Sequence, residues 1–214
     1  MIERRQFLKT TGTVALAATA AAAPAFVQPA AAQNIPVDDL MEPGPLPEMA
    51  IGPDDAPATI IEYASMTCGH CASFHNTTLP ELKERYIEPG KVRFILREYP
   101  LDVVALAAFM LARCVENDRY FAFITLLFER QREWAFGSQP LDSLFTMARQ
   151  VGMTRATFDE CLQNQELLEG INWVKQRADQ KFGVHSTPTF FINGRRVRGA
   201  IGIDDFEREL RPYV

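Results

Sequence analysis

The spacing of hydrophobic and polar residues divides the chain into strand-like and helix-like parts. Residues 58–65, ATIIEYAS, form a β-branched apolar run that predicts a buried strand. Residues 91–100, KVRFILREYP, predict a second strand that ends at Pro100. From residue 101 to about residue 183, apolar side chains recur at i, i+3, i+4 and i+7, which predicts a succession of helices.

Both ends of this pattern carry further elements. Asn193-Gly194, which ends TPTFFING and precedes RRVRGA, is a strong signal for a tight turn. These two segments therefore predict a hairpin over residues 189–199. Residues 202–214, GIDDFERELRPYV, predict a short closing helix. Residues 33–57 are rich in proline and acidic side chains, so we expect an extended lead-in there.

The segment between the first two strands, residues 71–90, looks helical, with a kink or restart at Pro80 and a stop at Pro89-Gly90. Strand, helix and strand in this order predict a parallel pair joined by a right-handed crossover. The expected fold class is therefore α/β, a mixed central sheet covered by helices, with the helical block bulging from one side. Within that block, Thr154 is expected to cap a helix start and Gly183 a helix end.

The N-terminal residues have the layout of an export signal. Arg4, Arg5 and Lys9 precede an alanine-rich apolar run, roughly residues 13–27, and a small-residue cleavage site ends at Ala32. Since the apolar run is too short to span a bilayer, we expect residues 1–32 to be removed on export to the periplasm. The paired arginines resemble the twin-arginine consensus, and the general secretory route is the alternative.

Charge excludes two classes of partner. The signal contains three of the 22 basic residues and one of the 27 acidic ones, which leaves 19 basic and 26 acidic side chains, a net charge of −7. No stretch after residue 33 has the basic clustering that nucleic acid or anionic lipid requires. Neither partner is therefore expected.

The four cysteines carry the candidate chemistry. Cys68 and Cys71 stand in SMTCGHCASFH, and their spacing permits a redox pair, a metal site or a structural crosslink. If Cys68 pairs with Cys71, then Cys114 and Cys161 remain, on two different predicted helices. In an oxidising compartment a crosslink between them is favoured, with two buried free thiols or electron exchange with the first pair as alternatives.

The position of Cys68 favours redox chemistry. A helix that begins at or just after Cys68 brings its sulfur close to unpaired backbone N–H groups, which stabilise the thiolate and lower its pKa. His70 adds a donor, and positive charge when it is protonated. Cys71, one turn into the helix, is expected to be less exposed and to act as the resolving thiol.

Other classes of site fit less well. Structural zinc usually takes ligand pairs from separated segments, whereas Cys68, His70, Cys71 and His75 all lie in one, and His75 reads as a partly exposed helix residue. Ala72 stands where a haem-attachment motif needs histidine, and no metal or other cofactor is expected. A cysteine hydrolase needs no second cysteine three residues on. A non-enzymatic module of the same fold has no use for a reactive thiolate.

Together these features resemble the DsbA-like branch of the thioredoxin superfamily, exported thiol–disulfide oxidoreductases with a helical domain inserted into a thioredoxin fold. The resemblance covers residues 58–214. It rests on Cys68-Gly69-His70-Cys71 after a strand, Thr187-Pro188 before a later strand, the helical insert, and PTFFING. It implies a thioredoxin-fold domain built from residues 58–100 and 184–214, with residues 101–183 as the insertion. Ser186 departs from the family, where glycine is frequent.

The resemblance also implies roles for particular residues. Glu62 takes the place of the family's buried carboxylate, which assists proton transfer at the inner cysteine, although an edge-strand surface residue is the alternative. Pro188 resembles the cis-proline that faces the cysteine pair, and it would hold the backbone of Thr187 for pairing with a substrate strand.

The expected activity is oxidation of reduced, newly exported proteins by a monomer, with isomerase or reductase activity as the alternative. The resemblance implies a quinone-linked membrane partner of the DsbB type, which would re-oxidise the cysteine pair.

Overall fold

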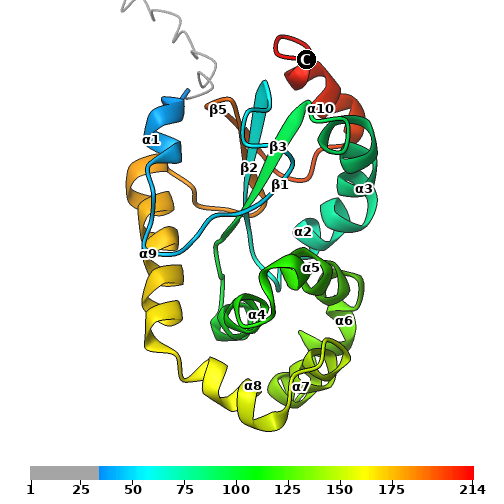
Figure 1. Ribbon diagram of the computed structural model, residues 1–214, viewed down its shortest axis with the longest axis vertical. Helices are drawn as coiled ribbons and strands as arrows, with labels where there is room; N and C mark the ends of the chain where they lie inside the picture. The colour runs from blue at the N-terminus through cyan, green and yellow to red at the C-terminus, as the bar shows by residue number, and fades with distance from the viewer. Residues whose placement is uncertain (1–33) are drawn as a thin grey trace, which may run out of the picture. The chain divides into compact units, whose positions relative to one another are not determined.

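The computed structural model describes residues 34–214, so the expected export signal and its cleavage site lie outside the described residues. A five-stranded mixed sheet with the strand order β1-β3-β2-β4-β5 forms the centre of the described part (Figure 1). Strands β2 and β3 are parallel, and the remaining neighbours are antiparallel. The strands are β1 (Met49–Ile51), β2 (Ala58–Ala64), β3 (Val92–Glu98), β4 (Thr189–Ile192) and β5 (Arg195–Arg198). The α/β fold class is confirmed.

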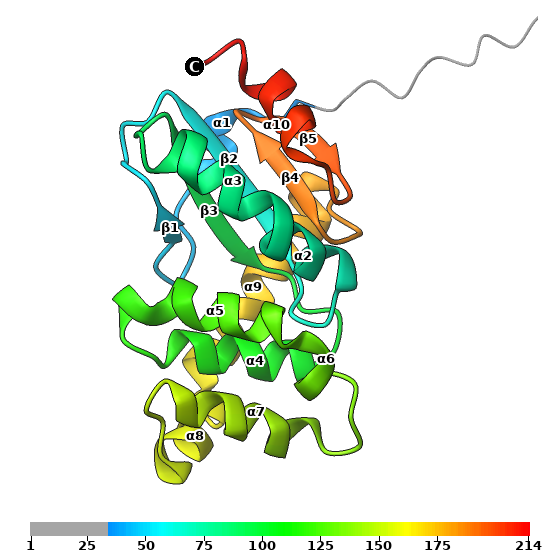
Figure 2. The same ribbon diagram turned by 90° about the vertical axis from the view of Figure 1, so that its right-hand side faces the viewer.

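In the sequence, a block of helices separates strands β1 to β3 from strands β4 and β5. The first group is α1 (Val37–Met41), α2 (Gly69–Ser73) and α3 (Leu79–Leu82), and the chain closes with α10 (Ile203–Leu210). Between β3 and β4 lie α4 (Val103–Arg113), α5 (Tyr120–Glu129), α6 (Gln131–Trp134), α7 (Pro140–Gln150), α8 (Arg155–Leu162) and α9 (Gln165–Phe182). Figure 2 shows α4 to α8 gathered beyond one end of the sheet. Among the described helices, none combines the length and the apolar character that crossing a bilayer requires.

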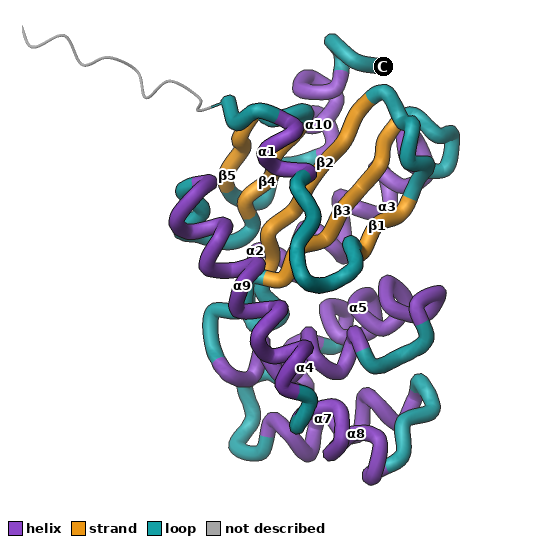
Figure 3. Tube along the Cα trace, turned by 60° about the vertical axis from the view of Figure 1, so that its left-hand side comes forward, coloured by secondary structure: helices purple, strands orange, loops and turns teal. Residues whose placement is uncertain are grey.

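The alternation of side chains along the strands gives the sheet two buried faces. Ile60 and Ala64 of β2 pack in a large core with α2, α3, α10 and the helices beyond the sheet. Ile61 and Tyr63 point to the opposite face, where a second core includes Phe182 of α9. In Figure 3, α1 and α9 lie along this second face. The C-terminal part of α9 therefore covers the sheet, although it falls within the expected insertion, residues 101–183.

The lead-in differs from the expectation. Residues 33–57 are not simply extended, because they contain helix α1 and strand β1. Leu40 of α1 is 1% exposed and packs in the second core, while β1 pairs with the edge of β3. A five-residue helix and a three-residue strand are too short to produce a hydrophobic period, so tertiary contacts alone specify them.

The helix after β2 is irregular where the sequence indicates. A π-helical turn at Phe74–Thr78 separates α2 from α3, and Pro80 lies in the first turn of α3. A proline lacks the N–H for a helical hydrogen bond, so the restart at Pro80 is confirmed with its expected cause. A second π-helical turn at Lys83–Ile87 was not expected.

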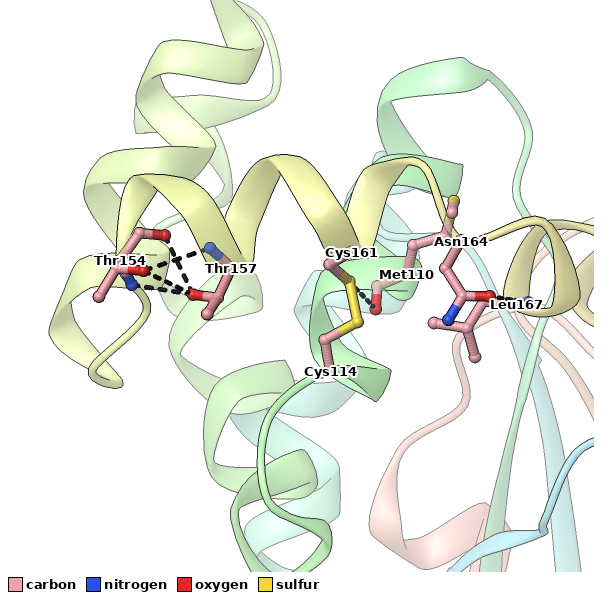
Figure 4. Close-up of a disulfide and its surroundings, with 7 residues drawn as sticks. All are labelled: Met110, Cys114, Thr154, Thr157, Cys161, Asn164 and Leu167. Carbon is pink, nitrogen blue, oxygen red and sulfur yellow. Dashed lines mark hydrogen bonds between the residues drawn. A yellow bond between two sulfur atoms is a disulfide. The ribbon is translucent and has the colours of Figure 1, made fainter.

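Several local predictions are confirmed. Asn193 and Gly194 have φ values of 43° and 87°, as a tight hairpin turn with two left-handed residues requires. Thr154 caps α8 through the N–H of Thr157, and Gly183 ends α9 with φ 61°. The expected crosslink between Cys114 and Cys161 is also present, joining the C-terminus of α4 to α8 (Figure 4).

Candidate active site

Cys68 lies where the sheet meets its first covering helix. Strand β2 ends at Ala64, a short turn follows, and Cys68 is the N-cap residue of α2 with extended backbone angles. The sulfur of Cys68 accepts a hydrogen bond from the N–H of Cys71, with 3.4 Å between the heavy atoms. The sequence thus folds so that a helix start presents its unpaired amides to one sulfur.

The surroundings of Cys68 favour its thiolate. Its pKa is lowered from 9.0 to about 5. The largest cause is a hydrogen bond from the Cys71 side chain, followed by Thr187 and the backbone amides of Cys71 and His70, while burial opposes the shift. The imidazole of His70 is exposed, and it is the backbone of this residue that contributes to the lowered pKa.

Cys71 has the opposite properties. It is fully buried, and Cys68 is 9% exposed, as the sequence led us to expect. Burial raises the pKa of Cys71 well above its ordinary value of 9.0, and the hydrogen bond to Cys68 and the charge of Glu62 raise it further. Both cysteines are free thiols in this structure. The pair therefore combines one sulfur that favours the ionised form and is slightly exposed with one that favours the protonated form and is fully buried.

The loop before β4 forms the wall opposite Cys68. The Thr187–Pro188 peptide is cis, as the family resemblance implied. The Cys68 sulfur lies 3.4 Å from the Thr187 carbonyl oxygen, across 119 residues of sequence. The hydroxyl of Thr187 is buried and has no other hydrogen-bond partner within the described residues, so it can donate to the Cys68 thiolate.

A carboxylate and an imidazole lie beneath the pair. Glu62 is fully buried on the face of β2 that α2 covers, so the alternative of a surface residue is wrong. His75 was expected to be partly exposed, which is also wrong, because it is 4% exposed. Its Nε2 lies 2.8 Å from Glu62 Oε2. His75 lies four residues after the buried Cys71 and so shares its helix face, but no local signal pairs it with Glu62, which stands 13 residues earlier in the chain.

Residues of the helical block hold the turn before Cys68. The side-chain amide of Gln131 in α6 donates to the carbonyl oxygens of Met66 at 2.8 Å and Cys68 at 3.0 Å. Asp102 caps α4 through the N–H of Ala105 and accepts a hydrogen bond of 2.6 Å from the hydroxyl of Thr67. Sequence reasoning missed Gln131 and Asp102. The only available signal was that Asp102 precedes an apolar helix, as an N-cap residue does.

The same site offers little to a metal ion. Across residues 34–214, no group of three or more His, Cys, Asp or Glu side chains is placed to hold one. What the arrangement can do is chemistry at sulfur, since a stabilised thiolate can both attack a disulfide and leave one readily.

Known proteins share this arrangement of sequence and fold. A family model described as Thioredoxin matches residues 46–211. A protein of Rickettsia bellii named "Putative protein-disulfide oxidoreductase" is 30% identical over 152 residues, which are 69% of this chain and 57% of that protein. The chain thus spans little more than half the length of this curated relative.

Two crystal structures extend the comparison. Wolbachia pipientis alpha-DsbA1 superposes with a TM-score of 0.76 at 30% identity, covering 82% of this chain and 94% of that one. Oxidised BdbD from Bacillus subtilis superposes with a TM-score of 0.70 at 20% identity, covering 78% and 92% of the two chains, a likeness of fold alone.

Proposed function

The protein belongs to the DsbA-like branch of the thioredoxin superfamily, and from that premise we propose that it is an exported thiol:disulfide oxidoreductase that introduces disulfide bonds into periplasmic proteins. The observation that carries the proposal is the contrast between two cysteines one helical turn apart. The pKa of Cys68 is lowered to about 5, whereas that of Cys71 is raised. Such a pair has one sulfur suited to exchange with a substrate and one suited to resolve the intermediate.

In the proposed reaction the oxidised enzyme carries a Cys68–Cys71 disulfide. A substrate thiolate attacks the Cys68 sulfur, a mixed disulfide forms, and Cys71 leaves with the electron pair and takes up a proton. A second substrate thiolate then attacks the substrate sulfur of the mixed disulfide, and Cys68 leaves as a thiolate. The substrate dithiol loses two electrons, which remain on the reduced cysteine pair.

The direction of transfer follows from the stability of the Cys68 thiolate. A lowered pKa stabilises the reduced pair, which makes its disulfide a stronger oxidant. Thioredoxin, a reductase, has a cysteine pKa of about 7, and DsbA, an oxidase, one of about 3.5. Because the value for Cys68, about 5, lies between these, disulfide isomerisation is the second candidate activity.

The remaining roles complete the proposal. The backbone of Thr187, beside Pro188, pairs with an extended substrate segment while the mixed disulfide exists, and Glu62 exchanges a proton with Cys71. A quinone-linked membrane protein of the DsbB type removes the two electrons after each turnover. The sulfur atoms carry the electrons themselves, so the monomer needs no cofactor. Residues 1–32 direct export and are removed near Ala32.

Trapping tests the proposal. In Cys71→Ser, the Cys68 thiolate should attack an unfolded protein substrate whose thiol carries a small disulfide-linked group, and the small thiolate leaves. The resulting mixed disulfide between Cys68 and the substrate should persist, because the resolving thiol is missing. Cys68→Ser should form no adduct and should not oxidise substrate. Cys114→Ala/Cys161→Ala is the matched control, since it removes the other two sulfurs and should keep the activity. A Cys68→Ser variant that oxidises substrate at the parental rate would refute the mechanism.

A further inference from the structure

His75 is a buried imidazole to which the exchange reaction gives no role. It is 4% exposed and stacks on the ring of Phe128, with 4.2 Å between ring centroids. The rings of Phe74 and Phe94 meet it edge-on. Its polar contact is with Glu62, through Nε2 and Oε2 at 2.8 Å. Burying the polar atoms of an imidazole among aromatic rings costs free energy, so the burial of His75 beneath the cysteine pair needs an explanation.

The buried atoms of His75 and Glu62 that lack hydrogen-bond partners indicate which of the two side chains carries a proton, and on which atom. Within the described residues, neither His75 Nδ1 nor Glu62 Oε1 has a hydrogen-bond partner, and both are buried. A proton on Nδ1 would be a buried donor without an acceptor, which is unfavourable. The arrangement without that cost is a neutral imidazole whose Nε2–H donates to Oε2 of an ionised Glu62. Oε1 then remains as the free basic atom of the carboxylate.

Cys71 lies on the side of the sheet to which this atom belongs. Glu62 and Cys71 are both fully buried, and Cys71 packs in one core with Ile60 and Ala64, which flank Glu62 on the same face of β2. The charge of Glu62 also raises the pKa of Cys71. We propose that His75 is a positioning residue of the thiol–disulfide exchange: by holding Oε2, it fixes the Glu62 carboxylate so that Oε1 exchanges the proton of Cys71. The inference rests on the proposed function and adds a residue to it.

The proton balance is closed at each step. Glu62 receives a proton at Oε1 before the exchange, from solvent or from a substrate thiol. When the substrate thiolate breaks the Cys68–Cys71 bond, Cys71 leaves as a thiolate and takes this proton. Glu62 is ionised again, and the hydrogen bond from His75 stabilises its charge. In the reverse direction Oε1 accepts the proton of the Cys71 thiol, and the Cys71 thiolate attacks the mixed disulfide at Cys68.

Other ionisable groups lie near this cluster. Tyr120 of α5 has its pKa raised well above its usual value by burial, and further by Glu98 and Glu62, so it stays neutral. Glu98 of β3 is paired with Arg113 of α4 at 2.6 Å. Cys68 titrates near pH 5. The pH profile of each variant is therefore compared with that of the parent between pH 6 and pH 9, because the ionisation of the dithiol and of Cys68 contributes to both and cancels in the comparison.

The experiment is the rate at which a small dithiol reduces the oxidised protein, measured by stopped flow between pH 6 and pH 9. His75→Leu should slow reduction tenfold or more at pH 7 and change the pH profile, since positioned proton transfer contributes about 10²–10⁴-fold. His75→Gln, whose amide can still donate to Oε2, should stay within about threefold of the parent, on the same scale. Glu62→Gln should slow the reaction as His75→Leu does. The double variant should be no slower than either, because His75 acts through Glu62.

Phe128→Leu is the packing control, since it removes the stacked ring and leaves the hydrogen bond. It should lower stability and keep both the rate and the pH profile. If His75→Leu lowers stability but reduces at the parental rate with the parental profile, His75 is structural and the inference is wrong. His75→Met takes the place of His75→Leu should the latter not fold. If the parent protein does not exchange with the dithiol, the proposed function itself is refuted. If the parent is active and His75→Leu has the same rate and pH profile, only the inference fails.

Discussion

The lowered pKa of Cys68 makes the stability of the reduced protein depend on pH. The pKa is 9.0 for the ordinary group and about 5 in the folded protein. Because the folded value is the lower one, the thiolate stabilises the folded state above pH 9 in full, and the contribution is lost as the pH falls through 5. Linkage gives a contribution of about 2.7 kcal/mol at pH 7 and about 0.4 kcal/mol at pH 5.

A comparison with Cys68→Ser isolates this contribution, since serine does not titrate in the range. Both proteins would be unfolded with urea at pH 5, 6, 7 and 8 in the presence of a phosphine reductant. The reductant opens the Cys114–Cys161 disulfide in both proteins, so its effect cancels in the difference. The free energy of unfolding of the parent, relative to the variant, should rise by about 2.3 kcal/mol between pH 5 and pH 7.

The pH dependence of this difference is the decisive quantity. Any loss of packing in Cys68→Ser changes its stability by a similar amount at every pH, whereas the thiolate term rises by about 1.4 kcal/mol for each pH unit above 5. A difference that stays constant from pH 5 to pH 8 would mean that Cys68 is not ionised by its surroundings. The thiolate absorbance near 240 nm would then also fail to appear below pH 7.

Two further predictions concern the helical block. Replacing both Cys114 and Cys161 with alanine should lower the free energy of unfolding by about 4 kcal/mol, since the crosslink joins residues separated by 47 positions. Denaturant unfolding of the non-reduced proteins measures this loss, and an unchanged unfolding midpoint would contradict the prediction. Gln131→Leu removes the donor to the Met66 and Cys68 carbonyl oxygens and should cost about 1–3 kcal/mol. The exposed Gln163→Leu is its control, and equal stabilities of the two variants would show that the buried hydrogen bonds contribute nothing.

The sequence was informative where a local pattern carries the structure. The apolar run at residues 58–65 is buried on both faces, so it forms a central strand without ambiguity. The Asn193-Gly194 turn and the caps at Thr154 and Gly183 have local physical causes and were predicted correctly. The cis peptide before Pro188 came from the family resemblance alone, because no local pattern specifies it.

The misses share a different cause. His75 was expected to be partly exposed, as polar helix residues usually are, but it is buried and pairs with Glu62, 13 residues earlier in the chain. Gln131 donates a hydrogen bond to Met66, which is 65 residues away in the sequence, and no local sequence pattern predicts this contact. Strand β1 exists because the edge of β3 is available to pair with it. Contacts of this kind depend on how distant segments are brought together, so they appear only with the three-dimensional structure.

The reduction potential of the Cys68–Cys71 pair tests the central claim most directly. It is measured by equilibrating the protein in glutathione buffers and quantifying the alkylated thiols of the pair by mass spectrometry. With the pKa of Cys68 at about 5, we expect a potential between about −120 mV, the value of a dedicated oxidase, and about −180 mV, that of an isomerase. A potential near −270 mV, as in thioredoxin, would identify a reductase and contradict the account.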